Sequence, residues 1–389
     1  MRNFYHDSRL ELKARCQSKI MKIKFQSIGS SARAARVFSF VGIGVILMAG
    51  GCATQTRTPK AVYEFYPSPP DEPHLQFLTA FNSEKQLGSN PERSFMSYIT
   101  GQQPREKSIS KPYGVVARGH KFYICDTDYG AVLEADLKSK RMFVFMAQGQ
   151  GVLKTPLNMT IDTDGNFYVA DSGRDQVVVY DKDENYVAAI GKLGEMKPRD
   201  VAVTKDRIYV ADIQNHNVHV YDRATRANLF VIPHGSDSTN ANKRLYSPTN
   251  LAVDSKGHLY VADTGAFTVQ VYDADGNYVR SVGGMGDSLG QFARVKGIAI
   301  DRQDRLYAVD AMSQVVQVFN DKGQLLTWFG EPGVAGRVQN LPAKVMVDYD
   351  DVGYFKDYIS PDFKVEYLVV VINQLGSHMV SIYGFGHPK

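Results

Sequence analysis

The sequence HLYVAD, residues 258–263, is the clearest copy of a short phrase that recurs along the chain and decides its fold. In each copy an aromatic residue and two small or aliphatic residues precede an aspartate, and successive aspartates lie 41 to 51 residues apart. The other copies are FYICD at 122–126, FYVAD at 167–171, IYVAD at 208–212 and LYAVD at 306–310. Repeats of this length are typical of propeller blades, each of which is one small sheet.

Each repeat predicts four short strands. The unit around residues 258–263 contains NLAVD at 250–254, TVQVY at 268–272 and YVRSVG at 278–283. These segments are rich in valine and tyrosine, and pairs such as Lys256-Gly257 and Asp275-Gly276 separate them. Such residues favour strands joined by tight turns. The apolar runs do not alternate strictly, as expected of sheets that pack on neighbours through both faces.

A sixth, weaker copy covers residues 367–373 and is followed by VSIY at 380–383, but no fourth strand follows it. The segment LQFLTAF, residues 75–81, has the composition of that missing outer strand. We therefore predict an all-β, six-bladed β-propeller whose ring is closed by an N-terminal strand that completes the C-terminal blade. This closure would leave neither terminal sheet with a free edge.

The opening of each unit carries a second phrase, proline followed by a variable residue, a glycine or polar residue and an apolar residue. It reads PYGV at 112–115, PLNM at 156–159, PRDV at 198–201 and PTNL at 248–251. Together with the aspartate phrase, this pattern resembles the NHL-repeat family over about residues 73–387. The resemblance implies a six-bladed propeller, and propeller lipoproteins of this kind imply a place in the bacterial cell envelope.

The first 51 residues have the parts of a secretory signal. Basic residues precede an apolar run at 37–48, and Ala49-Gly50-Gly51-Cys52 resembles the motif for lipid attachment. We therefore expect residues 1–51 to be a lipoprotein signal peptide, with translation starting at Met1 or at Met21, and Cys52 to carry lipid. The apolar run is shorter than the ~20 residues of a membrane span, the alternative reading.

The rest of the chain is not basic. Of the 45 basic and 41 acidic residues, 36 and 39 lie in residues 52–389, which leaves a net charge of −3 and no footprint for nucleic acid. Residues 52–72, rich in proline, predict a tether to the membrane, and residues 73–389 the propeller. Ala53 after the lipidated cysteine favours the outer over the inner membrane, on the periplasmic or the outer surface.

Catalytic and metal-binding patterns are weak. An aspartate that recurs at the end of a strand in every blade is expected to bind backbone N–H groups, and Cys125 replaces an alanine of the repeat. The histidines do not share one repeat position, so we predict no metal, no cofactor and no catalytic residue. Asn158, Asp200 and Asn250 partly resemble the channel set of lactonase-type propellers, although no matching glutamate accompanies them.

Two groups of residues are candidates for binding. The positions after each opening proline are expected to ring the mouth of the channel and to form a mildly cationic rim. The candidate ligand-binding residues there are Tyr113, Asn158, Arg199, Asp200, Asn250, Lys296 and Lys344. Three connections, 84–110, 231–247 and 349–363, are longer than the repeat requires, and the last contains Tyr354, Phe355 and Tyr358. Exposed aromatics suit a protein interface, and the alternative is that they cap the last blade.

The function predicted from the sequence is a membrane-anchored binding or scaffold module that holds another cell-envelope protein. The resemblance to propeller lipoproteins suggests an electron-transfer complex with a multihaem cytochrome as that partner. Two alternatives stay open. One is a lactonase- or lyase-like enzyme with a metal at the channel, and the other is a binder of a small anionic ligand or glycan.

Overall fold

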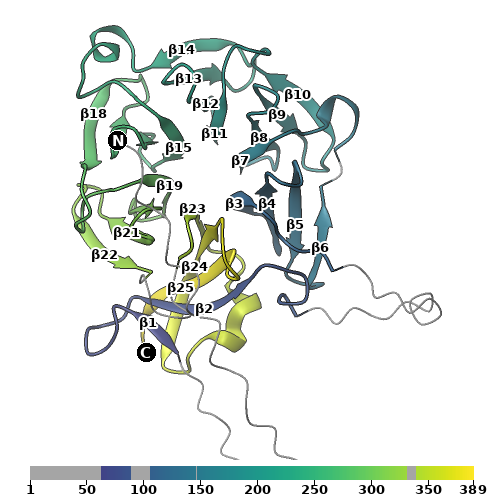
Figure 1. The fold of residues 1–389 in the computed structure, drawn as a ribbon, viewed down its shortest axis with the longest axis vertical. Coiled ribbons are helices and arrows are strands. Elements are labelled where there is room, and N and C mark those ends of the chain that lie inside the picture. Colours follow the sequence, from purple (N-terminus) through teal and green to yellow (C-terminus); the bar gives the residue numbers. More distant parts are fainter. Residues whose placement is uncertain (1–62, 89–105, 146, 331–338) are drawn as a thin grey trace, which may run out of the picture. The chain divides into compact units, whose positions relative to one another are not determined.

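The strands of the structure, a computed structural model that describes residues 63–88, 106–145, 147–330 and 339–389, form six antiparallel sheets. All of these residues belong to one unit, Ala61–Lys389. The innermost strands of neighbouring sheets contact each other all the way around, so the sheets are the blades of a ring (Figure 1). The six-bladed β-propeller prediction is confirmed. The predicted signal peptide and Cys52 lie outside the described residues.

Five blades have four strands in sequence order, from the channel outward. Blade 1 contains β3 (Pro112–Ala117), β4 (Lys121–Asp126), β5 (Ala131–Asp136) and β6 (Arg141–Val144). Blade 2 contains β7 (Pro156–Ile161), β8 (Phe167–Asp171), β9 (Gln176–Tyr180) and β10 (Tyr186–Ile190). Blade 3 contains β11 (Pro198–Val203), β12 (Arg207–Asp212), β13 (Asn217–Asp222) and β14 (Asn228–Ile232). Blade 4 contains β15 (Pro248–Val253), β16 (Leu259–Asp263), β17 (Thr268–Tyr272) and β18 (Tyr278–Gly283). Blade 5 contains β19 (Val295–Ile300), β20 (Leu306–Asp310), β21 (Val315–Phe319) and β22 (Leu325–Phe329).

Blade 6 is made from both ends of the propeller. It contains β23 (Pro342–Asp348), β24 (Phe363–Asn373) and β25 (Val380–Pro388), and then β2 (Leu75–Phe81) and β1 (Glu64–Tyr66) at its outer edge. Strand β2 pairs antiparallel with β25, from Leu75 opposite Phe385 to Phe81 opposite Val380. The predicted closure by an N-terminal strand is therefore confirmed. Three short 3₁₀ helices, η1 (Gly149–Gly151), η2 (Gly235–Ser238) and η3 (Val352–Tyr358), lie in the connections.

The tether prediction is wrong for residues 64–66. These residues form β1, a fifth strand in blade 6, which pairs with β2. Tyr66 is buried, and its ring packs on those of Phe329 and Tyr383 with centroids 6.3 and 6.0 Å away. The strand has only three residues and is followed by prolines, so its sequence looks like an extended linker although its last side chain joins the core.

The apolar runs bury both faces of each blade. Adjacent side chains on β9 show this: Val178 packs between blades 1 and 2, whereas Val177 packs between blades 2 and 3. Successive residues of a strand point to opposite faces, so a fully buried strand needs apolar residues at consecutive positions. The core is thus a series of interfaces between blades. Among the described residues, no helix has the length and apolar character needed to cross a bilayer.

Candidate functional site

The recurring aspartates hold the connections between blades. Both carboxylate oxygens of Asp171 accept backbone N–H groups, from Lys154 and Thr155 at 2.6 and 2.9 Å and from Gly173 and Arg174 at 3.0 and 3.2 Å. The corresponding residues of blades 1, 3, 4 and 5 make the same kind of bonds: Asp126, Asp212, Asp263 and Asp310. In blade 6, Asn373 accepts the N–H of Asn340 at 3.0 Å. These carboxylates are therefore committed to the backbone.

The predicted rim residues lie at the start of the inner strands, where a bulge follows the opening residue. The pairing of each inner strand with the next strand shifts register there, for example between Pro156 and Asn158. A bulge at the rim of a ring changes the direction of the following side chains. Asn158, Asp200 and Asn250 are fully or almost fully buried, with at most 1% of each exposed. They lie on the innermost strands β7, β11 and β15 of three consecutive blades.

Asp200 is the centre of this group. Its Oδ2 accepts hydrogen bonds from Nδ2 of Asn250 at 3.1 Å and from the N–H of Leu251 at 3.0 Å, and its Oδ1 from the N–H of Val201 at 2.8 Å. Lys344 of blade 6 adds an ion pair across the ring, with its Nζ 2.9 Å from the same Oδ2. Blades 3 and 6 are opposite each other, so this pair spans the channel.

Two glycines allow the inner strands to approach each other closely. A Cβ on Gly114 would lie 2.4 Å from Oδ1 of Asn158, and one on Gly297 would lie 2.4 Å from Cα of Lys344. Any larger residue would force neighbouring inner strands apart. This contact explains why the third position of the opening phrase holds glycine in blades 1 and 5, and why the predicted rim is narrow enough for one lysine to cross it.

Three cations remain at the mouth without a carboxylate partner in the described part of the chain: Arg199, Arg294 and Lys296. Lys296 is 7% exposed, its Nζ lies 5.6 Å from the ring centroid of Tyr113, and it donates a hydrogen bond to Oε1 of Gln374 at 3.2 Å. Burial, with the charges of Arg294 and Arg199, lowers the pKa of Lys296 to about 8. We call Tyr113, Arg199, Arg294 and Lys296 the mouth cluster.

Sequence reasoning missed Arg294. It lies directly before Val295, the first residue of β19, whereas the prediction considered only the two positions after the opening residue. Arg294 is exposed and acts on two other members of the cluster: its charge lowers the pKa of Lys296 and opposes the increase that burial causes in the pKa of Tyr113. The mouth is therefore more cationic than the rim positions alone predicted.

The second predicted surface, in η3, is only partly exposed. Tyr354 and Tyr358 have 43% and 45% of their surface exposed, but Phe355 has 5% and stacks on Phe122 with centroids 6.3 Å apart. The prediction of Phe355 as a partner-binding residue is wrong, because its ring fills the junction between blades 6 and 1. For this residue the alternative, an aromatic that caps the last blade, is right.

The possible catalytic groups are engaged elsewhere. Nε2 of His219 lies 3.1 Å from Oδ2 of Asp212, and Nδ1 of His258 lies 2.8 Å from Oδ2 of Asp254, in two different blades. The thiol of Cys125 is fully buried and burial raises its pKa. Within the described ranges, no group of three or more histidine, cysteine, aspartate or glutamate residues is placed to hold a metal ion.

Comparisons with known proteins agree with the architecture. A family described as a 6-bladed beta-propeller matches residues 239–329, and a search of curated proteins gave no match. A protein of unknown function from Bacteroides thetaiotaomicron superposes with a TM-score of 0.55, 14% identity, and coverage of 80% of this chain and 75% of that chain.

Two lyase structures are less similar. A streptogramin B lyase has a TM-score of 0.48 at 11% identity, and a catalytically inactive virginiamycin B lyase from Staphylococcus aureus with quinupristin has 0.46 at 12%. Each alignment covers 71% of this chain and 84% of the other. Likenesses at this level carry no conclusion about activity. The family match and the sheet order together show that this chain contains a six-bladed β-propeller.

Proposed function

We propose that the chain is a lipid-anchored recognition propeller of the bacterial cell envelope, which binds an acidic surface of another envelope protein over the mouth of its channel. The observation that carries this proposal is the mouth cluster, in which Arg199, Arg294 and Lys296 lie close together without an acidic partner among the described residues. Cations that repel one another and have no internal partner are favourable places for an external anion.

The charge of the rest of the chain supports this reading. Residues 52–389 carry a net charge of −3, so the cationic mouth differs in sign from the average surface. A local positive patch on an acidic protein orients an approaching acidic partner, because the remaining surface repels it. The lipid on Cys52 would keep the propeller at the membrane, on the outer membrane in our proposal, and an electron-transfer complex with a multihaem cytochrome is the partner that we would test first.

A catalytic role at the channel receives less support. The carboxylate of Asp200 is bound by two backbone N–H groups, the amide of Asn250 and the ammonium of Lys344. A carboxylate with four donors in contact has its lone pairs occupied and is a poor general base or metal ligand. The three residues that resemble a lactonase set do lie together, but their carboxylate is used to hold the ring.

A small anion is the second candidate for the same mouth. The specific observation is the burial of Lys296 beside the ring of Tyr113, since a shielded ammonium binds a carboxylate more strongly than an exposed one. A thermal-shift series with acetate, citrate and phosphate on the wild type and on Lys296→Gln would detect such binding. Stabilisation of the wild type alone would support this candidate.

The main proposal is tested by affinity purification of the full lipoprotein from detergent-solubilised membranes, with quantitative mass spectrometry. We expect an acidic envelope protein to be retained by the wild type and to be lost after Arg199→Glu with Arg294→Glu, and after washing with high salt. The matched control is Arg226→Glu, an exposed arginine in the β13–β14 turn at the far end of the strands. Equal recovery from the double variant and the wild type would contradict the proposal.

A further inference from the structure

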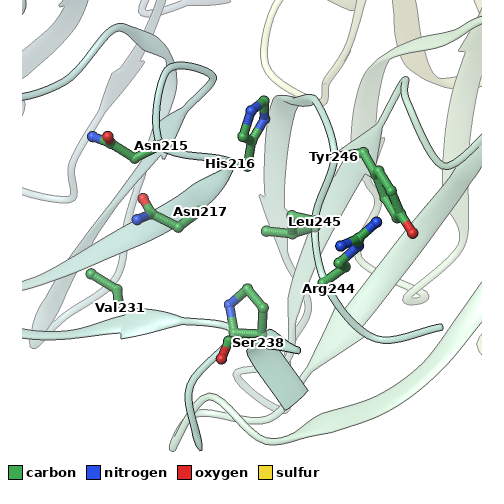
Figure 2. Close-up of a pocket in the computed structure, with 9 residues that line it drawn as sticks. Asn215, His216, Asn217, Val231, Ser238, Arg244, Leu245 and Tyr246 are labelled. Carbon is green, nitrogen blue, oxygen red and sulfur yellow. The ribbon is translucent and has the colours of Figure 1, made fainter. Parts of the chain in front are cut away.

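A hollow of about 520 Å³ lies at the junction of blades 3 and 4, apart from the mouth cluster (Figure 2). Its walls come from the β12–β13 turn on one side and from the β14–β15 connection on the other. The lining residues are Asn215, His216, Asn217, Val231, Pro233, Ser238, Arg244, Leu245 and Tyr246. Pockets that bind small ligands have volumes of roughly 300–1,000 Å³, so the hollow has a suitable size.

The β14–β15 connection, residues 233–247, is longer than the β10–β11 and β18–β19 connections, residues 191–197 and 284–294. Hydrogen bonds to its backbone fix its path: the N–H of Tyr246 donates to Oδ2 of Asp263 at 2.7 Å, and the side chains of Gln270 and Tyr272 donate to the carbonyls of Arg244 and Lys243 at 3.0 and 2.9 Å. A wall held in this way is preformed, and a ligand would bind without ordering it.

The corresponding turn of blade 2 provides a contrast with His216. It occupies the left-handed position of its turn, with φ of 56°, as Asp175 does in blade 2 with φ of 60°. Asp175 pairs with Lys197 of the following connection at 2.5 Å and accepts the N–H of Gly194 at 3.0 Å. In the described structure the ring of His216 makes no hydrogen bond, so the corresponding junction after blade 3 stays open.

The free polar groups of the hollow fit an anion. The guanidinium of Arg244 lies 4.3 Å from the ring centroid of Tyr246 and forms no ion pair with any described residue. None of the nine lining residues is acidic. A guanidinium next to an aromatic ring still has N–H groups to donate to a carboxylate, and His216 can donate a second hydrogen bond.

Three residues of the lining are apolar: Val231, Pro233 and Leu245. Leu245 is 3% exposed, so packing fixes its position. A ligand that matches this surface has an aliphatic group next to its carboxylate. We propose that the hollow binds the free C-terminus of a peptide that ends in an aliphatic residue, with the carboxylate on Arg244 and the last side chain on Val231, Pro233 and Leu245. This site is independent of the mouth cluster.

The test is calorimetric titration of the full chain with the peptide acetyl-Gly-Ser-Ala-Leu, with either a free C-terminal carboxylate or a C-terminal amide. We expect the amide, and likewise Arg244→Gln with the acid peptide, to bind about tenfold more weakly, since a charge-assisted hydrogen bond contributes about that much. His216→Ala should weaken binding by a smaller factor. Arg226→Gln and Arg199→Gln should bind the acid peptide as the wild type does.

Three results would overturn the proposal: no heat with the acid peptide at millimolar concentration, equal binding of acid and amide, or a loss in Arg199→Gln that Arg244→Gln does not share. The last result would place the carboxylate at the mouth cluster instead. Binding of glucuronate with the same dependence on Arg244, without binding of the peptide, would assign the hollow to acidic sugars. The outcome of the membrane purification does not affect this test, because it depends on residues elsewhere in the ring.

Discussion

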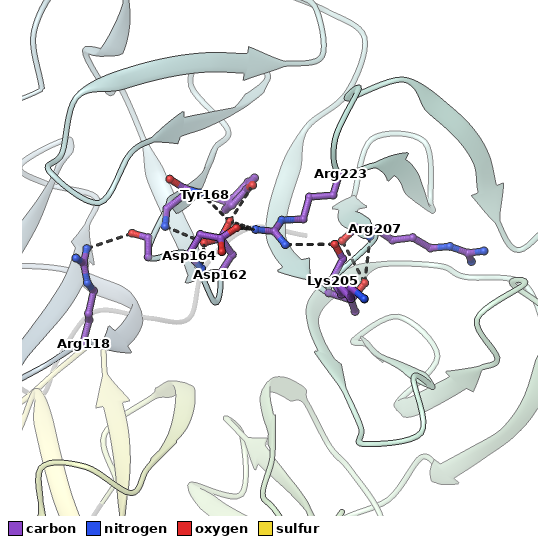
Figure 3. A network of polar contacts seen from close by, with 10 residues as sticks. Arg118, Asp162, Asp164, Tyr168, Lys205, Arg207 and Arg223 are labelled. Atoms are coloured by element: carbon purple, nitrogen blue, oxygen red, sulfur yellow. Dashed lines mark hydrogen bonds and ion pairs between the residues drawn. The ribbon is translucent and has the colours of Figure 1, made fainter.

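The arginines at the two ends of the strands differ in their partners: those at the turns bind acidic and carbonyl groups of neighbouring blades, whereas those at the mouth form no ion pair with a described residue. At the end away from the mouth, Arg223 of blade 3 reaches the β7–β8 turn of blade 2, 2.8 Å from Oδ2 of Asp162 and also in contact with Asp164 (Figure 3). The same guanidinium donates to the carbonyl of Lys205 at 3.2 Å, and Arg118 of blade 1 donates to that of Gly165 at 3.1 Å. We call these residues the turn network.

The turn network links blades 1, 2 and 3, whereas the cations of the mouth cluster form no ion pair with an acidic residue in the described ranges. The carboxylate of Asp162 shows the effect: burial alone would raise its pKa, but hydrogen bonds from Asn166 and Arg223 outweigh burial and lower it. At the mouth, burial and like charges lower the pKa of Lys296 instead. Charges at the turns therefore stabilise the ring, and charges at the mouth are unfavourable until something outside neutralises them.

The largest loss of stability is expected from breaking the ion pair between Lys344 and Asp200 in the channel. Lys344→Met leaves Asp200 buried with three neutral donors and no cation, which should lower the free energy of unfolding by about 3 kcal/mol. Urea denaturation measures the loss, and Lys138→Met, an exposed lysine, is the matched control. Adding Asp200→Asn to Lys344→Met should recover most of the stability. A Lys344→Met variant as stable as the control would show that the pair contributes nothing to the ring.

The next effect concerns the turn network. Arg223→Gln removes the cation from Asp162, whose side chain is 2% exposed, and should cost about 2 kcal/mol. Asp164 contributes less because its side chain is largely exposed. Arg226→Gln, three residues later and exposed, should change stability by less than about 0.5 kcal/mol. Equal stability of the two arginine variants in urea would remove the distinction between the two ends of the strands.

Much of this architecture follows from local sequence. The aspartate and proline phrases define six units, and the absence of a strand after Tyr383 led to Leu75–Phe81, because a missing strand is visible as a gap in a repeat. Strand β1 was missed because three residues are too few to show the alternation of apolar and polar residues that marks a strand. The exposure of Phe355 was wrongly predicted because the density of aromatics in a loop does not tell which ring enters the core.

The contacts across the channel depend on the closed ring. The rim positions could be located, since they follow each opening residue, but Lys344 and Asp200 are 144 residues apart and belong to opposite blades. Their contact depends on the diameter that the close approach of Gly114 and Gly297 permits. Sequence spacing gives the angle of a residue around the ring and does not give the distance across it.

Blade 6 departs from the turn pattern and provides a third comparison. In blades 4 and 5 the turn aspartate binds a donor four residues later, His258 for Asp254 and Arg305 for Asp301. Val352 has that place after Asp348, and the nearby carboxyl is that of Asp351. Oδ2 of both aspartates is buried without a donor in the described structure. The two acids therefore share one environment that favours the protonated form.

This pair predicts a pH dependence. Burial and the charge of Asp348 raise the pKa of Asp351 to about 7, whereas an unfolded aspartate titrates near 3.9. Between these values the folded chain binds more protons, so the free energy of unfolding falls as the pH rises. Asp351→Asn supplies a neutral donor to Asp348. At pH 8 this variant should be more stable than the wild type by about 1–2 kcal/mol, and at pH 5 the gain in stability should be smaller. Denaturation at both pH values measures this difference, with the exposed Asp287→Asn, away from the pair, as control. A pH-independent difference would contradict the shared environment.

The smallest effect has the opposite sign to that of Lys344→Met and concerns Lys296, which forms no ion pair with a described residue. The pKa of Lys296 in the folded chain is about 8, below the value of about 10.4 in an unfolded chain. The unfolded state therefore binds more protons between these values, and the free energy of unfolding rises with pH across that window. Below pH 8 Lys296 is charged in both states, and the folded chain bears the full free-energy cost of burying that charge.

Lys296→Gln removes the charge at similar length and should raise the free energy of unfolding by about 1 kcal/mol at pH 7, with the gain disappearing near pH 10.5. Denaturation at the two pH values would measure this gain. Destabilisation comparable to that of Lys344→Met would mean that the mouth cluster is structural, and a gain in stability would indicate that its charge is kept for a partner.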